Sequence, residues 1–381
     1  MKVGLGLLQD EFALTGEFQI FQGWAAKARA SSLETRLFSP AGEGLRGDGL
    51  VRHETGESLL KTFREQWQFI DRAAALAADV DALHLFLPTP NFLWIADRAK
   101  RRARKPVVVT CLGEKAEIRR LGGVRTLAGG FRFHLIRLAA AKVLSEGRFL
   151  CDRYVAGTES VAEQLQRSGC PGERVTVRLP FLPPESEADE RSIRAAESID
   201  PSRTFLYLGH FLASKGVDVL LKAFAALNDP ESRLVLAWSG IGDRGAVERS
   251  LAGLGIAERT SILDFPVHRT TVMNRALALV LPYPVSYGQT SPPMALLEAF
   301  RAGVPVIVSG LAPMPALGAE GETMHRVAPG DWRGLSSKLR ELRSDGASAE
   351  AMRRAQRPRY EESCGSADLR AFYEEVVAHG R

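Results

Sequence analysis

Cysteine is scarce in this sequence, and long apolar runs are missing. The four cysteines in 381 residues stand far apart and form no CxxC pair. This pattern excludes a disulfide framework and a cysteine zinc site, and it predicts reduced thiols. No apolar run reaches the roughly 18 residues that a membrane-spanning helix needs, and the first residues lack the pattern of a secretory signal. These absences favour a cytoplasmic protein without a membrane span.

Charge of either sign is not in large excess, but basic residues are concentrated in one stretch. The net charge is +5, yet 15 Lys or Arg residues stand against 4 Asp or Glu between Arg98 and Arg153. Within residues 98–142 the basic residues are interleaved with apolar ones. A cationic amphipathic surface of this kind suits peripheral contact with the anionic inner face of a membrane. An ordinary solvated helix face is the alternative, and the lack of a nucleic-acid motif predicts no nucleic-acid partner.

Short apolar strands alternate with amphipathic helices along the whole chain. This alternation predicts an α/β protein with two Rossmann-like, doubly wound domains that face a central cleft. The expected strands are residues 2–8, 82–87, 106–111, 153–156, 175–179, 204–208, 232–238, 261–263, 278–281 and 304–308.

Composition predicts the domain boundaries. Residues 184–202 are charged and contain no aromatic residue, which is typical of a linker. The linker would separate an N-terminal domain of residues 1–183 from a C-terminal domain of residues 203–365. We expect residues 366–381 to form a C-terminal helix that packs back towards the N-terminal domain.

The stretch Thr290–Gly310 predicts an anion-binding helix start. Ser291 suits an N-cap, and Pro292 and Pro293 suit the first helical positions, where no N–H is needed. The helix follows the strand expected at residues 278–281, so its N–H groups and dipole point towards a ligand at the carboxyl edge of the sheet. The groups expected to contact a phosphate there belong to Thr290, Ser291, Met294 and Ala295.

A second candidate phosphate site lies at residues 206–217, which read as strand, tight turn and helix. Gly209 allows a close turn at the end of the strand, and Lys215 stands just before the helix. A lone lysine is commonly a surface charge. This one follows a parallel strand, as Thr290 and Ser291 do, so we expect it at the same edge of the sheet.

These stretches resemble the nucleotide-binding domain of the GT-B-fold, retaining glycosyltransferases of family four. The phrase YLGHFLASKG resembles the family pattern Gly-Arg, four residues, Lys-Gly, with Lys215 at the lysine and His210 at the arginine. The phrase TSPPMALLE resembles the pattern Glu, seven residues, Glu, with Glu298 at the second position and Thr290 at the first. The resemblance implies that Lys215 neutralises the donor diphosphate and that Glu298 binds the donor ribose.

The resemblance extends to other turns of the chain. Phe265-Pro266-Val267 resembles the loop that holds the nucleobase, which implies contacts from Pro266 and Val267. The N-terminal half resembles the acceptor domain more loosely. Gly16 stands where a Gly-Gly loop approaches the diphosphate. His84 matches the first residue of a His-x-His phrase, whose second position is Phe86. A further family histidine is replaced by Leu112. Glu17 and Glu114 are candidates for contact with the acceptor.

The resemblance implies an enzyme of glycan biosynthesis. It would move a sugar from a nucleotide-diphosphate sugar to a hydroxyl of a glycan, a lipid or a small molecule, with retention at the anomeric carbon. In the front-face attack of such enzymes the leaving phosphate oxygen takes the acceptor proton, so no metal and no other cofactor is expected. The expected catalytic residues are Lys215, Thr290 and His84. Asp79-Val80-Asp81 spells a DxD but precedes its strand, so we interpret it as a loop.

Two other hypotheses stay open at this stage. The replaced positions Phe86, Leu112, His210 and Thr290 also suit a degenerate GT-B protein that binds nucleotide or glycan without transfer. A GT-B-like phosphorylase or epimerase is the third hypothesis. For His84 itself, which lies in an apolar strand, a hydrogen-bonded core histidine is the alternative. The sequence does not determine the nucleobase, the sugar, the acceptor or the oligomeric state.

Overall fold

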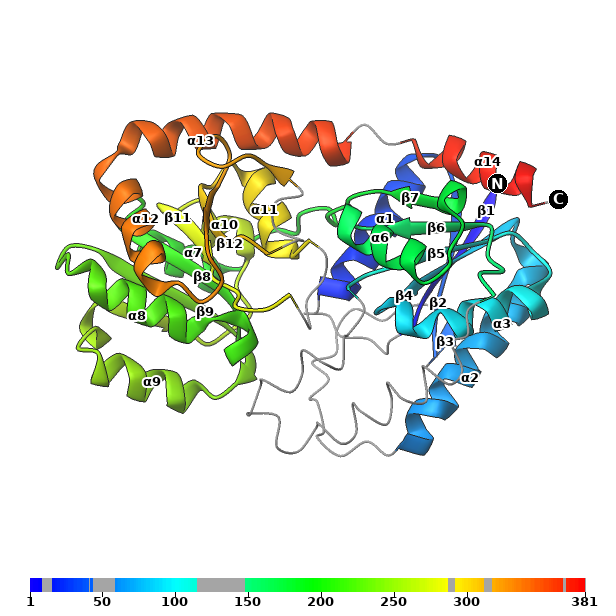
Figure 1. Ribbon diagram of the computed structural model, residues 1–381, viewed down its shortest axis with the longest axis horizontal. Coiled ribbons are helices and arrows are strands. Elements are labelled where there is room, and N and C mark those ends of the chain that lie inside the picture. Colours follow the sequence, from blue (N-terminus) through cyan, green and yellow to red (C-terminus); the bar gives the residue numbers. More distant parts are fainter. Residues whose placement is uncertain are drawn as a thin grey trace. The chain divides into compact units, whose positions relative to one another are not determined.

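The computed structural model describes residues 1–8, 16–40, 42–43, 59–114, 148–286, 292–311, 317–365 and 368–380. The chain forms two compact units, which Figure 1 shows with the course of the chain. Unit 1 contains Met1–Pro183 together with the C-terminal segment Ala367–Arg381. Unit 2 contains Pro184–Gly288 and Pro292–Ser366.

Unit 1 is built on a sheet of seven strands in the order β3-β2-β1-β4-β5-β6-β7. Its pairs are parallel except for the antiparallel pair of β2 with β3. The central strands β4 and β5 are buried along their whole length, as their continuous apolar sequences require. The strands are β1 (Lys2–Leu7), β2 (Glu34–Ser39), β3 (Gly42–Glu43), β4 (Ala82–Leu87), β5 (Val107–Cys111), β6 (Arg153–Ala156) and β7 (Val175–Val177).

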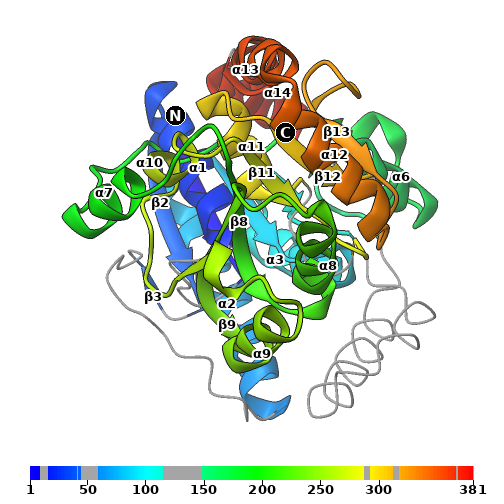
Figure 2. The same ribbon diagram turned by 90° about the vertical axis from the view of Figure 1, so that its left-hand side faces the viewer.

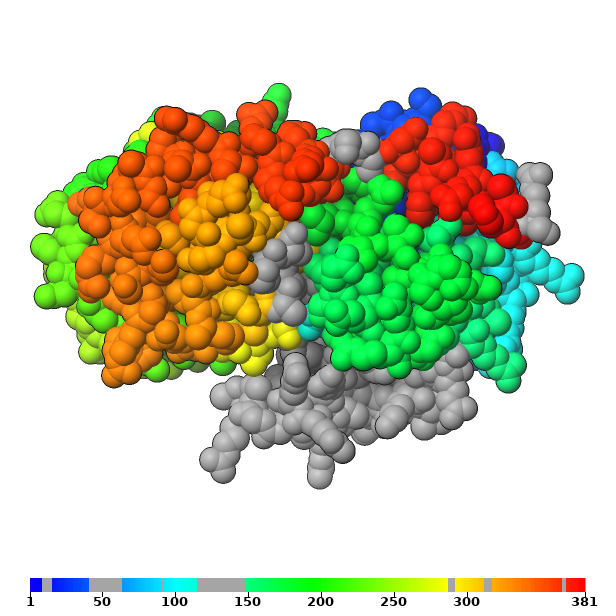
Figure 3. Space-filling model, turned by 45° about the horizontal axis from the view of Figure 1, so that its top comes forward, coloured from blue at the N-terminus to red at the C-terminus, as the bar shows by residue number. Residues whose placement is uncertain are grey.

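The helices of unit 1 include the C-terminal end of the chain. They are α1 (Gly16–Ala30), α2 (Leu59–Leu76), α3 (Leu93–Ala103), α6 (Glu159–Arg167) and α14 (Leu369–His379). Helix α14 packs on α1, where the Trp24 indole N–H donates to the Tyr373 hydroxyl at 2.8 Å. Figure 3 shows α14 in red against the blue and green elements of unit 1. The C-terminal residues therefore complete the core of unit 1.

Unit 2 is built on a parallel sheet of six strands in the order β10-β9-β8-β11-β12-β13. The chain runs outward from β8 to β10 and then returns to β11 beside β8, so the strand order reverses between β8 and β11. In such sheets the point of reversal is where ligands bind, outside the carboxyl ends of the strands. The strands are β8 (Thr204–Phe211), β9 (Arg233–Gly242), β10 (Thr260–Leu263), β11 (Ala278–Leu281), β12 (Val306–Ser309) and β13 (His325–Val327).

Helices cover the sheet of unit 2. Helices α8 and α12 lie side by side, as Figure 2 shows, and contribute Leu220 and Leu339 to the core. The helices are α7 (Glu190–Glu197), α8 (Val217–Leu227), α9 (Arg244–Gly253), α10 (Arg269–Met273), α11 (Met294–Ala302), α12 (Trp332–Ser344) and α13 (Gly346–Tyr360). The predicted α/β class with two doubly wound sheets is confirmed. Strands β2 and β13 are not predicted from sequence, because both carry charged residues and β13 has only three residues.

Residues 184–202, expected as a linker, contain helix α7 and belong to unit 2. Asp189 caps this helix by accepting from the Ser192 backbone N–H at 2.9 Å. The helix packs against α10, and the guanidinium of Arg275 donates to the Ala196 carbonyl at 3.4 Å. Absence of aromatic residues therefore does not indicate a linker here, since a small apolar face suffices to dock one short helix.

The basic stretch expected as a membrane-contact surface, residues 98–142, lies outside the described residues from position 115 onward. In its described part, the guanidinium groups of Arg98 and Arg102 lie 4.7 and 5.5 Å from the ring centre of Trp67. Arg102 also pairs with Asp71. These contacts assign packing roles to two of the basic side chains. Among the described helices, none combines the length and the apolar character needed to cross a membrane.

Candidate functional site

The carboxyl ends of β8 and β11 approach each other closely in unit 2. Gly216, which precedes α8, has a φ of +71°, and a Cβ built on it would lie 2.0 Å from the Pro282 carbonyl oxygen. Any side chain would therefore collide with the backbone that follows β11, and the left-handed φ itself favours glycine. This close approach carries Lys215 to the strand end at the point where the strand order reverses.

Lys215 contacts an aromatic side chain that sequence reasoning missed. Its ammonium nitrogen lies 4.8 Å from the ring centre of Tyr283, two residues after β11. Tyr283 is buried, and burial raises the pKa of its hydroxyl while the Arg269 guanidinium acts to lower it. Tyr283 is therefore a neutral side chain that lies near two cationic ones.

Glu298 lies on α11 with only 7% of its side chain exposed. Both of its carboxylate oxygens accept from Nη1 of Arg269, at 3.0 and 2.9 Å. Arg269 is the first residue of α10, and 29% of its side chain is exposed. A carboxylate buried to this extent requires such a charged donor, because desolvation otherwise disfavours its ionised form.

Two separate contacts involve the two residues that the family resemblance singles out. Lys215 lies over the ring of Tyr283, and Arg269 binds Glu298. Sequence reasoning did not find Tyr283 and Arg269. Tyr283 lies two residues after β11, and Arg269 lies five residues after Asp264, which follows β10. A position shortly after a predicted strand was the sequence signal that could have identified both residues.

The end of β8 is held by the neighbouring strand. The Tyr207 hydroxyl donates to the His210 carbonyl at 2.6 Å, and Nδ1 of His210 bonds to the Ser239 hydroxyl. Gly209, with a φ of +154°, lies between them. His210 therefore stands in a fixed orientation at the strand end, where the resemblance places the family arginine.

The loop expected to hold a nucleobase follows β10. Pro266 is exposed and Val267 half-buried, and the preceding ring of Phe265 is covered by the Arg191 guanidinium at 3.9 Å. Asp264 accepts from Arg244 at 2.8 Å, and this hydrogen bond holds the pKa of the carboxyl below its usual range. Helix α7 and the start of α9 therefore fix this loop.

The predicted phosphate-binding helix start is described only in part. Thr290 and Ser291 lie outside the described residues. Helix α11 begins at Met294 with Pro293 as its N-cap, so the expectation of helical Pro292 and Pro293 is wrong. The first N–H groups that bond the Pro293 carbonyl are those of Leu296 and Leu297. The N–H groups of Met294 and Ala295 stand before them, in the first turn where intrahelical acceptors are lacking.

The surroundings of His84 favour the core-histidine alternative, and its catalytic role stays a prediction. His84 lies on β4 with no exposed surface, and its nitrogens Nδ1 and Nε2 bond to the hydroxyls of Tyr373 at 2.6 Å and Thr110 at 2.7 Å. Phe86 stacks on its ring with centres 4.3 Å apart. Burial lowers the pKa of His84 well below its usual value, so the ring is neutral. His84 on the apolar strand β4, with its two hydroxyl partners, has the environment of a hydrogen-bonded core histidine.

The other unit 1 candidates lie at or near strand ends. Gly16 and Glu17 open helix α1, which follows β1. Glu114 is half-buried, three residues after β5, and its carboxylate accepts from the Ser160 hydroxyl at 2.8 Å. Leu112 is buried. The acceptor contacts expected of Glu17 and Glu114 stay predictions.

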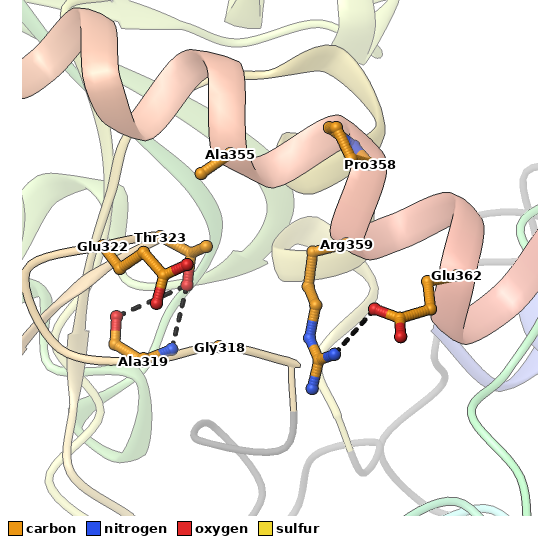
Figure 4. A pocket seen from close by; sticks show the side chains of 8 residues that line it. All are labelled: Gly318, Ala319, Glu322, Thr323, Ala355, Pro358, Arg359 and Glu362. Atoms are coloured by element: carbon orange, nitrogen blue, oxygen red, sulfur yellow. Dashed lines mark hydrogen bonds and ion pairs between the residues drawn. The ribbon is translucent and has the colours of Figure 1, made fainter.

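A separate pocket of about 770 Å³ lies in unit 2 beside α13. Figure 4 shows Arg359 paired with Glu362 on its wall, across from Thr323. None of the predicted donor-binding residues lines this pocket. Its size alone therefore does not make it the donor site, because the convergent charges lie at the strand ends.

Comparison with known sequences finds one matching family and relatives that align with part of this chain. Residues 202–345 match the family described as Glycosyl transferases group 1. The chain is 30% identical over 238 residues to a D-inositol 3-phosphate glycosyltransferase of Streptomyces avermitilis, covering 57% of this chain and 50% of that protein. It is 29% identical over 199 residues to the exopolysaccharide phosphotransferase SCO2592 of Streptomyces coelicolor, covering 51% of this chain and 20% of that protein. The matches thus span half or less of these relatives.

Solved structures resemble the chain over nearly its whole length. Alr3699/HepE of Anabaena in complex with UDP has a TM-score of 0.70 at 14% identity, covering 99% of this chain and 100% of that one. The sucrose-phosphate synthase of Thermosynechococcus elongatus has a TM-score of 0.72 at 17% identity, with 99% of each chain covered. At this level of identity the likeness establishes the fold, which is GT-B.

Proposed function

We propose that this chain, whose residues 202–345 match the group 1 glycosyltransferases, moves a sugar from a nucleoside-diphosphate sugar to a hydroxyl acceptor with retention of configuration. The observation that carries the proposal is a set of two contacts at the carboxyl edge of the unit 2 sheet, that of Lys215 with the ring of Tyr283 and that of Arg269 with the carboxylate of Glu298. They place a cation and a buried carboxylate where the strand order of a parallel sheet reverses, which is the usual place for a nucleotide.

The diphosphate is the group that this site has to stabilise. As the anomeric C–O bond breaks, negative charge builds up on the departing phosphate oxygen. The Lys215 ammonium and the first N–H groups of α11, at Met294 and Ala295, supply positive charge and donors in a fixed arrangement. The hydroxyls of Thr290 and Ser291, and Gly209 and His210 at the end of β8, complete the proposed diphosphate site in unit 2. Gly16, at the start of α1 in unit 1, is proposed to bind the donor as the family resemblance implies.

The nucleoside follows from the same site. Glu298 is proposed to bind the ribose hydroxyls with the acceptor capacity that Arg269 leaves unused, since an ionised carboxylate has about four acceptor positions. Pro266 and Val267 are proposed to contact the base. The Alr3699/HepE structures hold UDP in one case and UDP-glucose in another, which supports a nucleoside-diphosphate sugar as the donor here.

The acceptor is proposed to bind at the strand ends of unit 1, near Glu17 and Glu114. Its hydroxyl oxygen forms the new bond to the anomeric carbon, and its proton passes to the phosphate oxygen that leaves. The products are a glycoside and a nucleoside diphosphate, and no metal takes part. Turnover in the presence of EDTA tests the last statement, and a loss restored by a divalent cation would contradict it.

The setting of the reaction is proposed to be glycan biosynthesis in the cytoplasm, with peripheral contact to anionic membrane through residues 98–142. Co-sedimentation with vesicles that contain an anionic lipid, at low salt, tests this contact. Vesicles of neutral lipid are the control. Equal recovery of protein in both pellets would contradict the electrostatic contact.

The first experiment is a thermal-shift series with UDP, GDP, ADP and dTDP, each with and without a sugar. A ligand that binds only the folded chain raises Tm, so no acceptor is needed. Release of nucleoside diphosphate from the stabilising donor is then measured with candidate acceptors. Binding of nucleotide without turnover would favour the second candidate, a degenerate binding protein, which the core position of His84 supports. No shift with any nucleotide would contradict both.

A further inference from the structure

Arg178 stands at the carboxyl edge of the unit 1 sheet, directly after β7. Its backbone N–H donates to the Ala156 carbonyl at the end of β6, at 2.8 Å. Its side chain lines a small cavity together with Thr110 of β5 and Gly157, which follows β6. Three neighbouring strand ends therefore meet around one guanidinium group.

This guanidinium has no carboxylate partner among the described residues. Four described arginines have a buried Nε without a hydrogen bond, namely Arg178, Arg203, Arg301 and Arg343. The last three pair with Asp200 and Glu231, with Glu185 and with Asp229, respectively. Arg178 has instead the ring of Phe372, 5.4 Å away. It is the exception in this set.

Desolvation makes this arrangement costly. Burial lowers the pKa of the Arg178 guanidinium, and within the described part of the chain no carboxylate opposes that effect. A partly buried cation without a counter-charge is unfavourable unless a ligand supplies the charge. Arg353 shows the contrast, since its guanidinium donates to the carbonyls of Gly303, Ala276 and Leu277.

Arg178 has the only charged side chain among the described residues that line the cavity. The Thr110 hydroxyl is bonded to His84, whose ring is neutral, so this pair adds no charge. The cavity itself measures about 10 Å³, room for about one water molecule. A larger ligand must therefore meet the half-buried guanidinium from outside, at the edge of the sheet.

We propose that Arg178 binds the anionic group, a phosphate or a carboxylate, of the acceptor. The guanidinium fork matches the oxygens of either group and can bind them in a bidentate manner. The inference rests on the proposed function in one respect, the placement of the acceptor in unit 1. It adds a substrate class, an anionic acceptor, to that function.

The direct test observes the guanidinium by NMR in the full chain labelled with 15N-arginine. The Arg178 Nε–H signal is assigned by its loss in Arg178→Lys. Glucose, glucose 6-phosphate, glucuronate and inorganic phosphate are titrated separately. We expect this signal to shift with at least one anion and not with glucose. A response to phosphates alone or to glucuronate alone names the class, whereas no shift with any anion overturns the proposal.

The second test measures affinity by calorimetry with the same ligands. Wild-type protein is expected to bind one anionic sugar at least tenfold more tightly than glucose, and Arg178→Gln is expected to reduce that ratio to about twofold or less. Arg167→Gln is the control, since it removes an exposed arginine of unit 1 that pairs with Glu163. A ratio that survives Arg178→Gln, with unchanged Tm, overturns the proposal.

These readouts separate the inference from the proposed function. Neither the NMR titration nor the calorimetry needs a donor or turnover. If nucleotides stabilise the protein but Arg178 responds to no anion, the anion site is wrong and the transferase proposal stands. If Arg178 binds an anionic sugar but no nucleotide binds, the transferase proposal is wrong and the anion site stands.

Discussion

Arg269 binds both carboxylate oxygens of Glu298 through a single guanidinium nitrogen, Nη1, at 2.9 and 3.0 Å. Arg269 opens α10 and Glu298 lies within α11, so the pair joins two helices whose starts lie at the same edge of the sheet. The pair gives a buried carboxylate a charged partner at the residue that the resemblance assigns to the donor ribose. The proposed function therefore predicts that this one ion pair affects both the stability of unit 2 and its affinity for nucleotide.

Breaking this ion pair from the arginine side is expected to destabilise the protein. Arg269→Gln leaves the Glu298 carboxylate buried without its charged partner, which costs about 2 kcal/mol once the partial exposure of Arg269 is allowed for. Arg269→Gln combined with Glu298→Gln should recover most of that loss. Urea unfolding at pH 7 measures both. Equal stability of Arg269→Gln and the wild type would contradict a structural role for the pair.

Removal of the lysine at the end of β8 is expected to affect the reaction and not the fold. Lys215→Ala should lower kcat by about 10²-fold to 10³-fold, the usual effect of deleting one group that stabilises a developing negative charge. Tm should stay close to that of the wild type. Lys222→Ala is the control, because Lys222 is exposed on α8. Turnover of Lys215→Ala at the wild-type rate would rule out the diphosphate role.

The close approach at Gly216 predicts a large cost for a single methyl group. Gly216→Ala forces a Cβ towards the Pro282 carbonyl oxygen and keeps a left-handed φ, so we expect a loss of about 2 kcal/mol or more. Gly253→Ala is the matched control, since its Cβ meets nothing within 4 Å at the end of α9. That variant should be neutral or more stable by about 0.5 kcal/mol. Thermal unfolding of both variants measures these changes in stability. Similar losses of stability in the two variants would exclude the steric explanation.

The buried His84 predicts a loss of stability in mild acid. Its pKa in the folded chain lies well below 6.5 because of burial, while the unfolded chain takes up a proton near that value. Below pH 6.5 the unfolded state therefore binds more protons, and stability falls with a limiting slope of about 1.4 kcal/mol per pH unit from this residue. Urea unfolding at pH 7.5, 6.5 and 5.5 measures the slope.

His84→Gln should remove this contribution to the slope, whereas His379→Gln, at an exposed position on α14, should retain it. The same variant tests the catalytic role expected of His84. If His84 is a core residue, His84→Gln retains turnover per folded molecule once stability is accounted for. Loss of kcat in a fully folded His84→Gln would support the catalytic assignment.

The sequence by itself determined the α/β class and most of the strands. A short run rich in β-branched residues, such as Val107–Cys111, favours a buried parallel strand, because such side chains pack well on a pleated sheet and a run of this length is short for a helix. Lys215 and Glu298 could also be identified, since a motif records residue types and spacing. The sequence predicts that the helix starts at Pro292, two residues before its actual start at Met294. The reason is that proline is accepted both at an N-cap and in the first helical turn.

Only the tertiary structure decided which side chains meet. Tyr283 and Arg269 carry no motif, and Trp24 and Tyr373 are 349 positions apart, so no local pattern places them together. His84 has two interpretations in the sequence, and only the structure shows the hydrogen bonds to the hydroxyls of Thr110 and Tyr373 that favour the structural one. The charge of Arg178 is visible in the sequence, but the absence of a carboxylate partner for it among the described residues is not. Local propensity is read along the chain, whereas burial, pairing and desolvation depend on contacts that only folding creates.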